Sequence, residues 1–467
     1  PIPPGPKVVR MPTQDAWVKY RDWGKEYGEL VYLSDRNTLI INKSEVAIDL
    51  LEKRARIYSD RIMTPIMKLC GLETIFGLLN YSEKWRRARR NFQQLFRQAA
   101  ISRFYPVQYS KTNELLRKLL VAPDDFMNHT MALSQGPVYS AIYGLEVRSE
   151  DPLAQKAVQV MFAIGQAILS GAFPVLEQFP FLRYMPSWFP GCGIQQFANQ
   201  CRKGIEEIDT IPFNIAVNNL KSGTGTSPIA ELVAKKPTQI EAVKAMGIAS
   251  YVGETCCFSV VVFLIYMLSI CLHPDIQIKG QEEIDRVIGK DRLPTFEDRP
   301  SMPYIEAIYH EVMRLDPAIP LDNAYGLPHA STEDDFYYGY YIPEGCTVIP
   351  NIWLVAMNRD PDVYAEPDKF MPSHFIDSTN TINDIYAYGF GRRVCAGRYM
   401  ADNTIWLTIA SVLATFTLGK AKDEKGNEID IPGEYTNQFL RHPKPYRSSI
   451  TPRNQRAKDL ILATVAQ

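Results

Sequence analysis

The sequence lacks the features that mark several common classes of protein. Its 51 basic and 52 acidic residues leave a formal net charge of −1, so no positive excess points to nucleic acid as a partner. Its eight cysteines form no CxxC pair and show no zinc-ligand spacing. We therefore expect neither a nucleic-acid-binding protein nor a zinc protein, and a reducing compartment suits the cysteines best.

No linker rich in glycine or serine and no internal repeat divides the 467 residues, although the length alone allows ~3 domains. Hydrophobic residues make up 46% of the chain, which is ample for one large core. Residues 256–272 carry no charge and would form a helix about 25 Å long, at the lower limit for spanning a bilayer. Helical signals continue toward the amino terminus, so we expect one long central helix, residues 238–272, within a single domain, residues 1–467.

Hydrophobic periodicity predicts a chain that is mainly α with small peripheral β-sheets. Strand-like runs at residues 30–41 surround the turn Asp35-Arg36-Asn37, and a second hairpin is expected at residues 340–349 around Pro343-Glu344-Gly345. Strong helical periodicity occurs near residues 44–57, 83–99, 238–272, 276–288, 303–315 and 398–416.

The most informative cysteine is Cys395, in the segment Tyr388-Gly389-Phe390-Gly391-Arg392-Arg393-Val394-Cys395-Ala396-Gly397. This loop runs into the helical pattern that begins at Arg398. A cysteine at a helix start meets unpaired backbone N–H groups and the positive end of the helix dipole, which favour the thiolate that binds iron. Gly391 and Gly397 leave room for a tight turn and for the close approach of a flat cofactor. The alternative is a buried structural cysteine behind a turn.

This loop resembles the heme-binding loop of the cytochrome P450 superfamily. That pattern has a phenylalanine seven residues before the cysteine and then glycine, arginine, cysteine and glycine, and four of the five positions match here. Tyr388 stands where phenylalanine is usual, which keeps an aromatic ring but adds a hydroxyl group that needs a partner. The resemblance implies the cytochrome P450 fold, heme b (iron protoporphyrin IX) as cofactor and Cys395 as the iron ligand.

Other segments carry the same resemblance and imply further contacts with the heme. Trp85 and Arg89 match the family's Trp-x-x-x-Arg helix, whose i,i+4 spacing lets both side chains reach a propionate. His329 resembles another propionate contact, and Arg393 and Gly397 belong to the cofactor-binding loop. Without the cysteine motif, a basic solvated helix face explains residues 83–90 equally well. A positive surface for an acidic electron donor is expected from Arg86, Arg87, Arg90, Arg392 and Arg398.

Glu311 and Arg314 lie three residues apart in a helical pattern, so their side chains share a face. Most pairs at this spacing are solvated bridges of small worth. This pair is distinguished by its resemblance to the family's Glu-x-x-Arg helix, where the buried pair holds the cysteine loop against a later segment, here residues 370–375. The third partner is usually an arginine where His374 stands, so we expect a weaker or pH-sensitive contact.

On the long helix, Glu254 and Thr255 resemble the acid–alcohol pair that relays protons to dioxygen in this family. A buried carboxyl shuttles protons and a hydroxyl orients water, and general acid help is worth ~10² to 10⁴ in rate. The alternative is an exposed glutamate and a threonine bonded to its own helix backbone. Val252 stands where glycine is usual and Cys256 follows the pair, so an altered oxygen groove is expected.

The implied substrate is apolar. The lining segments by resemblance are residues 62–79, 161–173 and 318–321, and the last contains Ile319, Pro320 and Leu321. Apolar composition describes any core equally well, and residues 322–326 look like extra sequence beside the pocket. Residues 173–189 are expected to form an apolar surface loop that dips into a membrane.

The resemblance covers nearly the whole chain, and residues 292–300 and 442–446 look like those of fungal members that modify secondary metabolites or xenobiotics. It implies a monooxygenase that inserts one atom of dioxygen into a small apolar substrate. A separate NADPH-dependent cytochrome P450 reductase is expected as the electron donor, since no nicotinamide or flavin fingerprint is evident.

Two alternatives stay open: a peroxide-using or substrate-rearranging heme-thiolate enzyme, and a non-enzymatic heme binder or sensor. Residues 1–6 resemble the proline-rich hinge that follows the membrane anchor of microsomal members. That resemblance implies a monomer at the cytoplasmic face of the endoplasmic reticulum membrane.

Overall fold

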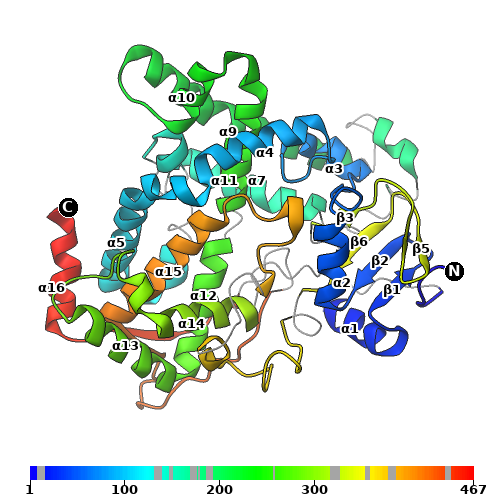
Figure 1. Cartoon of the computed structure of the whole chain (residues 1–467). Coiled ribbons are helices and arrows are strands. Elements are labelled where there is room, and N and C mark those ends of the chain that lie inside the picture. Colours follow the sequence, from blue (N-terminus) through cyan, green and yellow to red (C-terminus); the bar gives the residue numbers. More distant parts are fainter. Residues whose placement is uncertain are drawn as a thin grey trace.

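The computed structural model describes residues 1–7, 16–130, 139–146, 151–168, 176, 179–185, 193–255, 258–315, 327–352, 358–376, 385–436 and 443–466. Helices make up most of these residues (Figure 1). The α-helices are α1 (Ala16–Tyr27), α2 (Ser44–Ile48), α3 (Pro65–Leu69), α4 (Glu83–Phe96), α5 (Tyr105–Val121), α7 (Pro152–Ile168), α9 (Gly193–Ser222), α10 (Pro228–Lys235), α11 (Ile240–Thr255), α12 (Phe258–Leu272), α13 (Pro274–Ile288), α14 (Pro303–Leu315), α15 (Arg398–Thr415) and α16 (Gln455–Ala463). The strands are β1 (Leu30–Leu33), β2 (Thr38–Ile41), β3 (His329–Ala330), β4 (Asp335–Tyr337), β5 (Tyr340–Ile342), β6 (Thr347–Pro350), β7 (Phe416–Lys420) and β8 (Ser448–Pro452).

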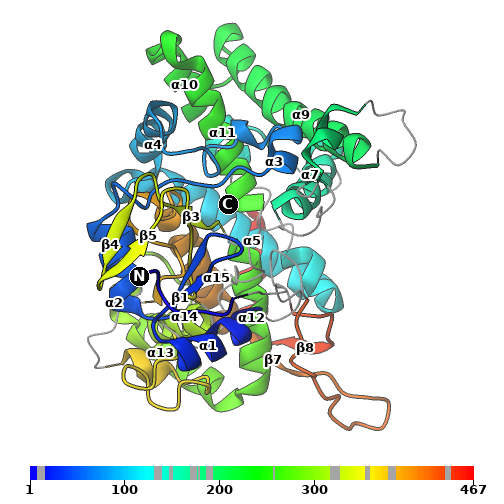
Figure 2. The same ribbon diagram turned by 90° about the vertical axis from the view of Figure 1, so that its right-hand side faces the viewer.

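The largest sheet has four strands in the order β1-β2-β6-β3 and lies beside α1 and α2, near the amino terminus (Figures 1 and 2). β1 and β2 form an antiparallel hairpin, from Leu30 opposite Ile41 to Leu33 opposite Thr38, which confirms the first predicted hairpin. All residues of both strands are buried. β6 pairs in parallel with β2, with Thr347 opposite Thr38, although the two strands are far apart in the chain.

The second predicted hairpin, residues 340–349, is wrong in its pairing. β5 pairs with β4 in a two-stranded sheet, whereas β6 pairs with β2 and β3. Gly345, between β5 and β6, has a φ of 71°, a backbone conformation that glycine adopts readily. The turn therefore exists, but the two strands leave it for different sheets because β2 provides a partner for β6.

Within the predicted long helix, residues 238–272, the structure describes α11 and α12, and residues 256–257 lie outside the described residues. α12 is buried from Val262 to Cys271 and packs against α14 and α15, as expected of a core helix. Within the described ranges, no single helix has the length and hydropathy of a membrane span. Val262–Leu272 and α13 meet that test only as a pair bent by 107°.

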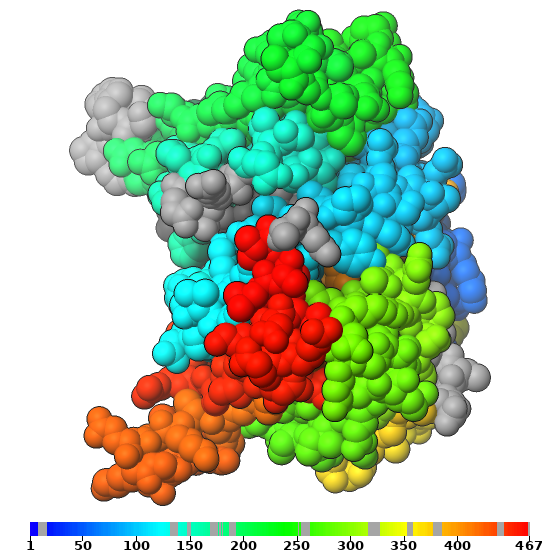
Figure 3. Space-filling view, turned by 90° about the vertical axis from the view of Figure 1, so that its left-hand side faces the viewer, coloured from blue at the N-terminus to red at the C-terminus, as the bar shows by residue number. Residues whose placement is uncertain are grey.

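Two large hydrophobic clusters form most of the core. One joins α4, α7, α9 and α11, and the other surrounds α12, α14 and α15. α15 is buried along most of its length and contacts α5, α12, α13 and α14. α16 packs against α5 and α15 near the carboxyl terminus, and Figure 3 shows it on that face of the molecule. The cysteine loop therefore leads into a helix that the core holds on several sides.

Candidate active site

The loop before α15 presents Cys395 to a cavity of about 310 Å³. Among the described cysteines four are buried, and Cys395 alone is exposed. Its N–H donates to the carbonyl of Tyr388 across 2.8 Å, and the hydroxyl of Tyr388 meets that of Tyr309 on α14 at 2.9 Å. α15 begins at Arg398 with Gly397 as its N-cap, so the cysteine lies at the amino-terminal end of an 18-residue helix.

The two glycines that the sequence singles out have different roles. Gly391 has a φ of 52°, and a Cβ atom there would lie 2.2 Å from the carbonyl oxygen of Leu51. Both the positive φ and the carbonyl oxygen of Leu51 therefore exclude a side chain at Gly391. Gly397 has a negative φ, lines the cavity, and would place a Cβ with nothing within 4 Å. Its missing side chain leaves space for a ligand.

Three guanidinium groups line the same cavity, those of Arg61, Arg89 and Arg393. Arg393 donates to the backbone carbonyls of Ser59 and Leu79, each across 2.7 Å, and Arg61 donates from one nitrogen to a backbone carbonyl. Arg61 Nε and Arg393 Nη1 are buried and have no hydrogen-bond partner in the described part of the chain. Two of the three arginines therefore have buried N–H donors that are available to a ligand.

The electrostatics of this cluster favour an anion. Burial lowers the pKa of Arg61 well below its usual range, lowers that of Arg89, and lowers that of Arg393 to about 10. Arg393 lowers the pKa of Arg61 further, and Arg89 lowers that of Arg393, because the charges repel. Buried, unsatisfied guanidinium donors fit a carboxylate-bearing ligand. The two propionates of a heme are such groups, so the residues present fit the cofactor that the sequence implies.

Trp85 and His329 complete this polar end of the cavity. Trp85 is buried, and the guanidinium of Arg393 lies 4.5 Å from its ring centroid. His329 Nδ1 lies 2.7 Å from the carbonyl oxygen of Tyr58, an acceptor, so Nδ1 carries the proton. Burial, with the nearby Arg61, lowers the pKa of His329 well below its usual range. The ring is therefore neutral here, and an anion bound at the arginine cluster would raise that pKa.

All six predicted cofactor-binding residues line this one cavity; they are Trp85, Arg89, His329, Arg393, Cys395 and Gly397. Arg61 also lines it but is absent from the sequence-based set. No local pattern marks Arg61, because its place depends on a contact with the carbonyl of Leu327, which is distant in the chain.

The rest of the lining is largely apolar. The predicted segments 62–79 and 161–173 contribute side chains to it, and α4 adds two phenylalanines, with Phe92 and Phe96 ring centroids 4.5 Å apart. The apolar side chains include Ile75, Phe76, Leu78, Phe92, Phe96, Ile164, Ile168, Ala249, Val252 and Ile352. The predicted pocket residues Ile319, Pro320 and Leu321, with residues 322–326, lie outside the described residues.

α11 supplies one wall of the cavity up to Gly253. Glu254 and Thr255 are its last two residues, and Cys256 lies outside the described residues. Val252, which replaces the usual glycine, is 8% exposed and lines the cavity. The backbone thus carries the acid–alcohol pair directly beyond the cavity-lining turn.

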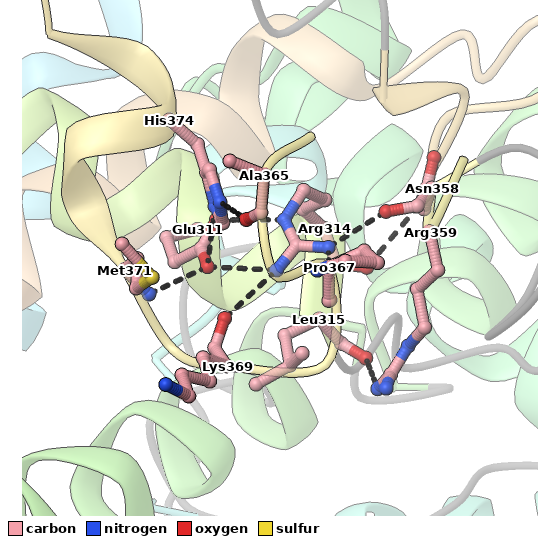
Figure 4. Close-up of polar contacts among 10 residues, drawn as sticks. All are labelled: Glu311, Arg314, Leu315, Asn358, Arg359, Ala365, Pro367, Lys369, Met371 and His374. Carbon is pink, nitrogen blue, oxygen red and sulfur yellow. Dashed lines mark hydrogen bonds and ion pairs between the residues drawn. The ribbon is translucent and has the colours of Figure 1, made fainter. Parts of the chain in front are cut away.

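α14 carries a fully buried ion pair. Arg314 Nε and Nη2 donate to the two carboxylate oxygens of Glu311 across 2.7 and 2.8 Å, and both side chains are 0% exposed. The other N–H groups of Arg314 donate to the backbone carbonyls of Asn358, Pro367 and Lys369 (Figure 4). The guanidinium therefore binds α14 to a long irregular segment.

His374 occupies the third position of this network. Its Nδ1 lies 3.1 and 3.2 Å from the carboxylate oxygens of Glu311, and its Nε2 lies 2.5 Å from the carbonyl of Ala365 (Figure 4). Both partners accept hydrogen bonds, so both ring nitrogens carry protons in this arrangement. Burial lowers the pKa of His374, but the hydrogen bond and charge of Glu311 outweigh it, and the pKa is raised. The Met371 N–H also donates to Glu311 across 2.7 Å.

The outer face of α4 is basic. Arg86, Arg87 and Arg90 are exposed and share a single carboxylate, that of Glu83. Arg392, in the cysteine loop, is also exposed and donates to a tyrosine hydroxyl. This surface therefore keeps a positive excess close to the loop.

Comparisons with known proteins agree with the fold. A family model described as Cytochrome P450 matches residues 5–450. The chain is 35% identical to cytochrome P450 monooxygenase COX1 of Coprinopsis cinerea, covering 96% of this chain and 90% of the relative. It is 33% identical to cytochrome P450 monooxygenase claR of Ampulloclitocybe clavipes, covering 98% and 88%. A zebrafish cytochrome P450 solved with abiraterone has a TM-score of 0.72 at 20% identity, covering 94% of this chain and 100% of that one.

The fold and these relatives define the class of protein, a heme-dependent oxidoreductase. Within that class, the chain belongs to the cytochrome P450 family and is a monooxygenase. The predicted family, the mainly α fold and the heme cofactor are therefore confirmed.

Proposed function

We propose that the protein inserts one atom of dioxygen into a small apolar molecule, with electrons from an NADPH-dependent cytochrome P450 reductase. The observation that carries this proposal is the position of Cys395, an exposed cysteine at a helix start that faces a cavity with arginines at one end and apolar side chains elsewhere. Cys395 would bind the iron, and the bound heme supplies the dioxygen chemistry, with the thiolate favouring O–O cleavage.

Each group of residues then has a role in the site. Arg61, Arg89, Arg393, Trp85 and His329 would hold the propionates. Arg61 and Arg393 carry the unsatisfied donors, Arg89 adds positive charge, and Trp85 and His329 line the same cavity. The apolar lining would exclude water and bind an apolar substrate.

We assign proton delivery to Glu254 and Thr255, at the carboxyl end of α11. This assignment is supported by the position of the two residues, which directly follow the cavity-lining residues of that helix. The carboxyl of Glu254 would hold and pass the proton, and the hydroxyl of Thr255 would orient it.

The exposed surface supports the proposed partners. The basic face of α4 with Arg392 suits an acidic reductase, because complementary charge steers association. Phe179, Phe181 and Tyr184 are 45%, 60% and 74% exposed in the described part of the segment that we assign to the membrane surface. Exposed aromatic side chains of this kind suit a bilayer interface. We accordingly propose a monomer on the cytoplasmic face of the endoplasmic reticulum.

A carbon monoxide difference spectrum of the reduced protein tests the ligand. The wild type should show the thiolate signature, Cys395→Ser should lose it, and Cys271→Ser, which changes a buried cysteine, should keep it. A thiolate signature in Cys395→Ser would contradict the assignment. A spectral-shift screen with terpenoids, steroids and polyaromatic compounds would then identify ligands. Their turnover should depend on NADPH and reductase, whereas turnover with peroxide alone would indicate the peroxide-using alternative.

A further inference from the structure

A pair of thiols lies outside the active-site lining, where α3 meets α9. Cys70 follows α3 as its C-cap residue, Cys201 lies within α9, and they are 0% and 2% exposed. The two side chains are near enough for each to shift the pKa of the other, although the residues are far apart in the chain. The other buried cysteines of the described ranges, Cys271 and Cys346, contact oxygen atoms instead.

Independent contacts fix these two segments against each other. Arg202, next to Cys201, donates to the carbonyl of Leu69 across 2.9 and 3.1 Å and to that of Lys68 across 3.1 Å. These carbonyls end α3, where a positive charge is favoured. Gly71 has a φ of 77°, and a Cβ there would lie 3.3 Å from Arg202 Cγ. The residues on both sides of Cys70 therefore rest against Arg202, which brings Cys70 to Cys201.

The environment distinguishes the two sulfur atoms. The neighbouring Cys70 thiol lowers the pKa of Cys201, whereas the Cys201 thiol, together with burial, raises the pKa of Cys70. The thiolate is the nucleophile in thiol oxidation, so Cys201 is the first to react. Arg202 is exposed, so the pair lies just below the surface of the protein.

We propose that Cys70 and Cys201 form a redox modification site that closes to a disulfide in the presence of hydrogen peroxide. The thiolate sulfur of Cys201 attacks one peroxide oxygen, the O–O bond breaks, and the other oxygen leaves as hydroxide and takes up a proton. The sulfur of Cys70 then attacks the sulfenic acid, the S–S bond forms, the S–O bond breaks and a second water leaves. The two thiols lose two electrons, peroxide gains them, and an external thiol reverses the reaction.

The bond would restrain one wall of the active-site cavity. Ile75, Phe76 and Leu78 line the cavity and follow Cys70 closely in the chain. A disulfide to α9 would therefore limit movement of residues 64–79 away from that helix. The effect on substrate entry rests on the proposed function, whereas the disulfide itself does not.

The test uses the heme-bound protein, treated with hydrogen peroxide, alkylated and digested without reduction. Mass spectrometry should find a Cys70–Cys201 cross-linked peptide that dithiothreitol removes. The cross-link should be absent from Cys70→Ala and Cys201→Ala and present in the control Cys271→Ala. Two results in the peroxide-treated wild type would overturn the proposal. One is that both thiols are still alkylated after the treatment, and the other is that Cys201 becomes a sulfinic acid without any cross-link.

Hydrogen exchange tests the restraint. Amide exchange in residues 64–79 should slow several-fold when the wild type is oxidised and should recover after reduction. Exchange in α16, far from the pair in the chain, should not change. A cross-linked protein with unchanged exchange in residues 64–79 would refute the restraint, and neither result depends on turnover.

Discussion

Raising the pH should weaken the buried contact between His374 and Glu311, and an arginine at position 374 should remove that dependence. The imidazole faces a carboxylate on one side and the Ala365 carbonyl on the other, so the folded protein favours the doubly protonated ring. Arg314 opposes this slightly, and the ring of Tyr364 packs against the imidazole edge to face. The raised pKa of His374 is the net result.

The sign of the effect follows from that shift. A histidine whose pKa is raised in the folded state contributes its full stabilisation at pH values below its unfolded-state pKa, near 6.5. This contribution is lost as the pH rises through the folded-state pKa. Deprotonation removes one charge-assisted hydrogen bond of a kind worth about 1.5–3 kcal/mol. We therefore expect the wild type to lose up to about 3 kcal/mol of unfolding free energy between pH 6 and 9 at this contact.

Denaturant unfolding of the heme-bound protein at several pH values provides the assay. The difference between the wild type and His374→Arg should grow with pH, because arginine stays charged throughout this range. His129→Asn is the matched control, since the imidazole of His129 lies 3.8 Å from the exposed carboxylate of Asp125 and 2.9 Å from the Ala122 carbonyl, outside the buried network of Glu311. Parallel profiles for the wild type and His374→Arg between pH 6 and 9 would refute the reasoning.

Three further predictions concern the rest of the site. Glu311→Gln should lower the unfolding free energy by about 3–5 kcal/mol, because it leaves a buried guanidinium unpaired, and a smaller loss in denaturant unfolding would show that the pair is solvated. Tyr388→Phe and Tyr309→Phe should each cost about 0.5–1.5 kcal/mol, and the double variant little more than either, since the two hydroxyls bond each other. Additive losses would argue against that bond. Arg61→Leu should speed the transfer of heme to an excess acceptor protein, whereas Arg86→Leu, on the surface, should leave the rate unchanged.

The elements that carry motifs could be predicted because their sequences are amphipathic and have clear ends. α4, α14 and α15 lie where periodicity puts them, within a few residues. α9 was missed, in part because Pro212 lies inside it, and proline usually ends a helix. Strand partners were missed for another reason, since the pairing of β6 depends on residues at the far end of the chain.

The residues of the candidate site likewise fall into those that a local sequence pattern predicts and those that depend on tertiary contacts. Cys395, Trp85 and Arg89 stand in local patterns whose spacing follows from helix and loop geometry, and the structure brings them to one cavity. Arg61 has no such pattern, and its role in the site depends on tertiary contacts alone. The same holds for the partner of the Tyr388 hydroxyl, which the sequence requires but does not identify.

The parallel pairing of β2 with β6 has a consequence for synthesis on the ribosome. About three hundred residues separate the two strands, so β2 waits roughly 15–60 s for its partner at ~5–20 residues per second. During that time the β1–β2 hairpin has an unpaired edge and apolar side chains that only the finished protein buries. The nascent amino-terminal segment is thus a natural client for a chaperone, and slower translation would lengthen its period of risk.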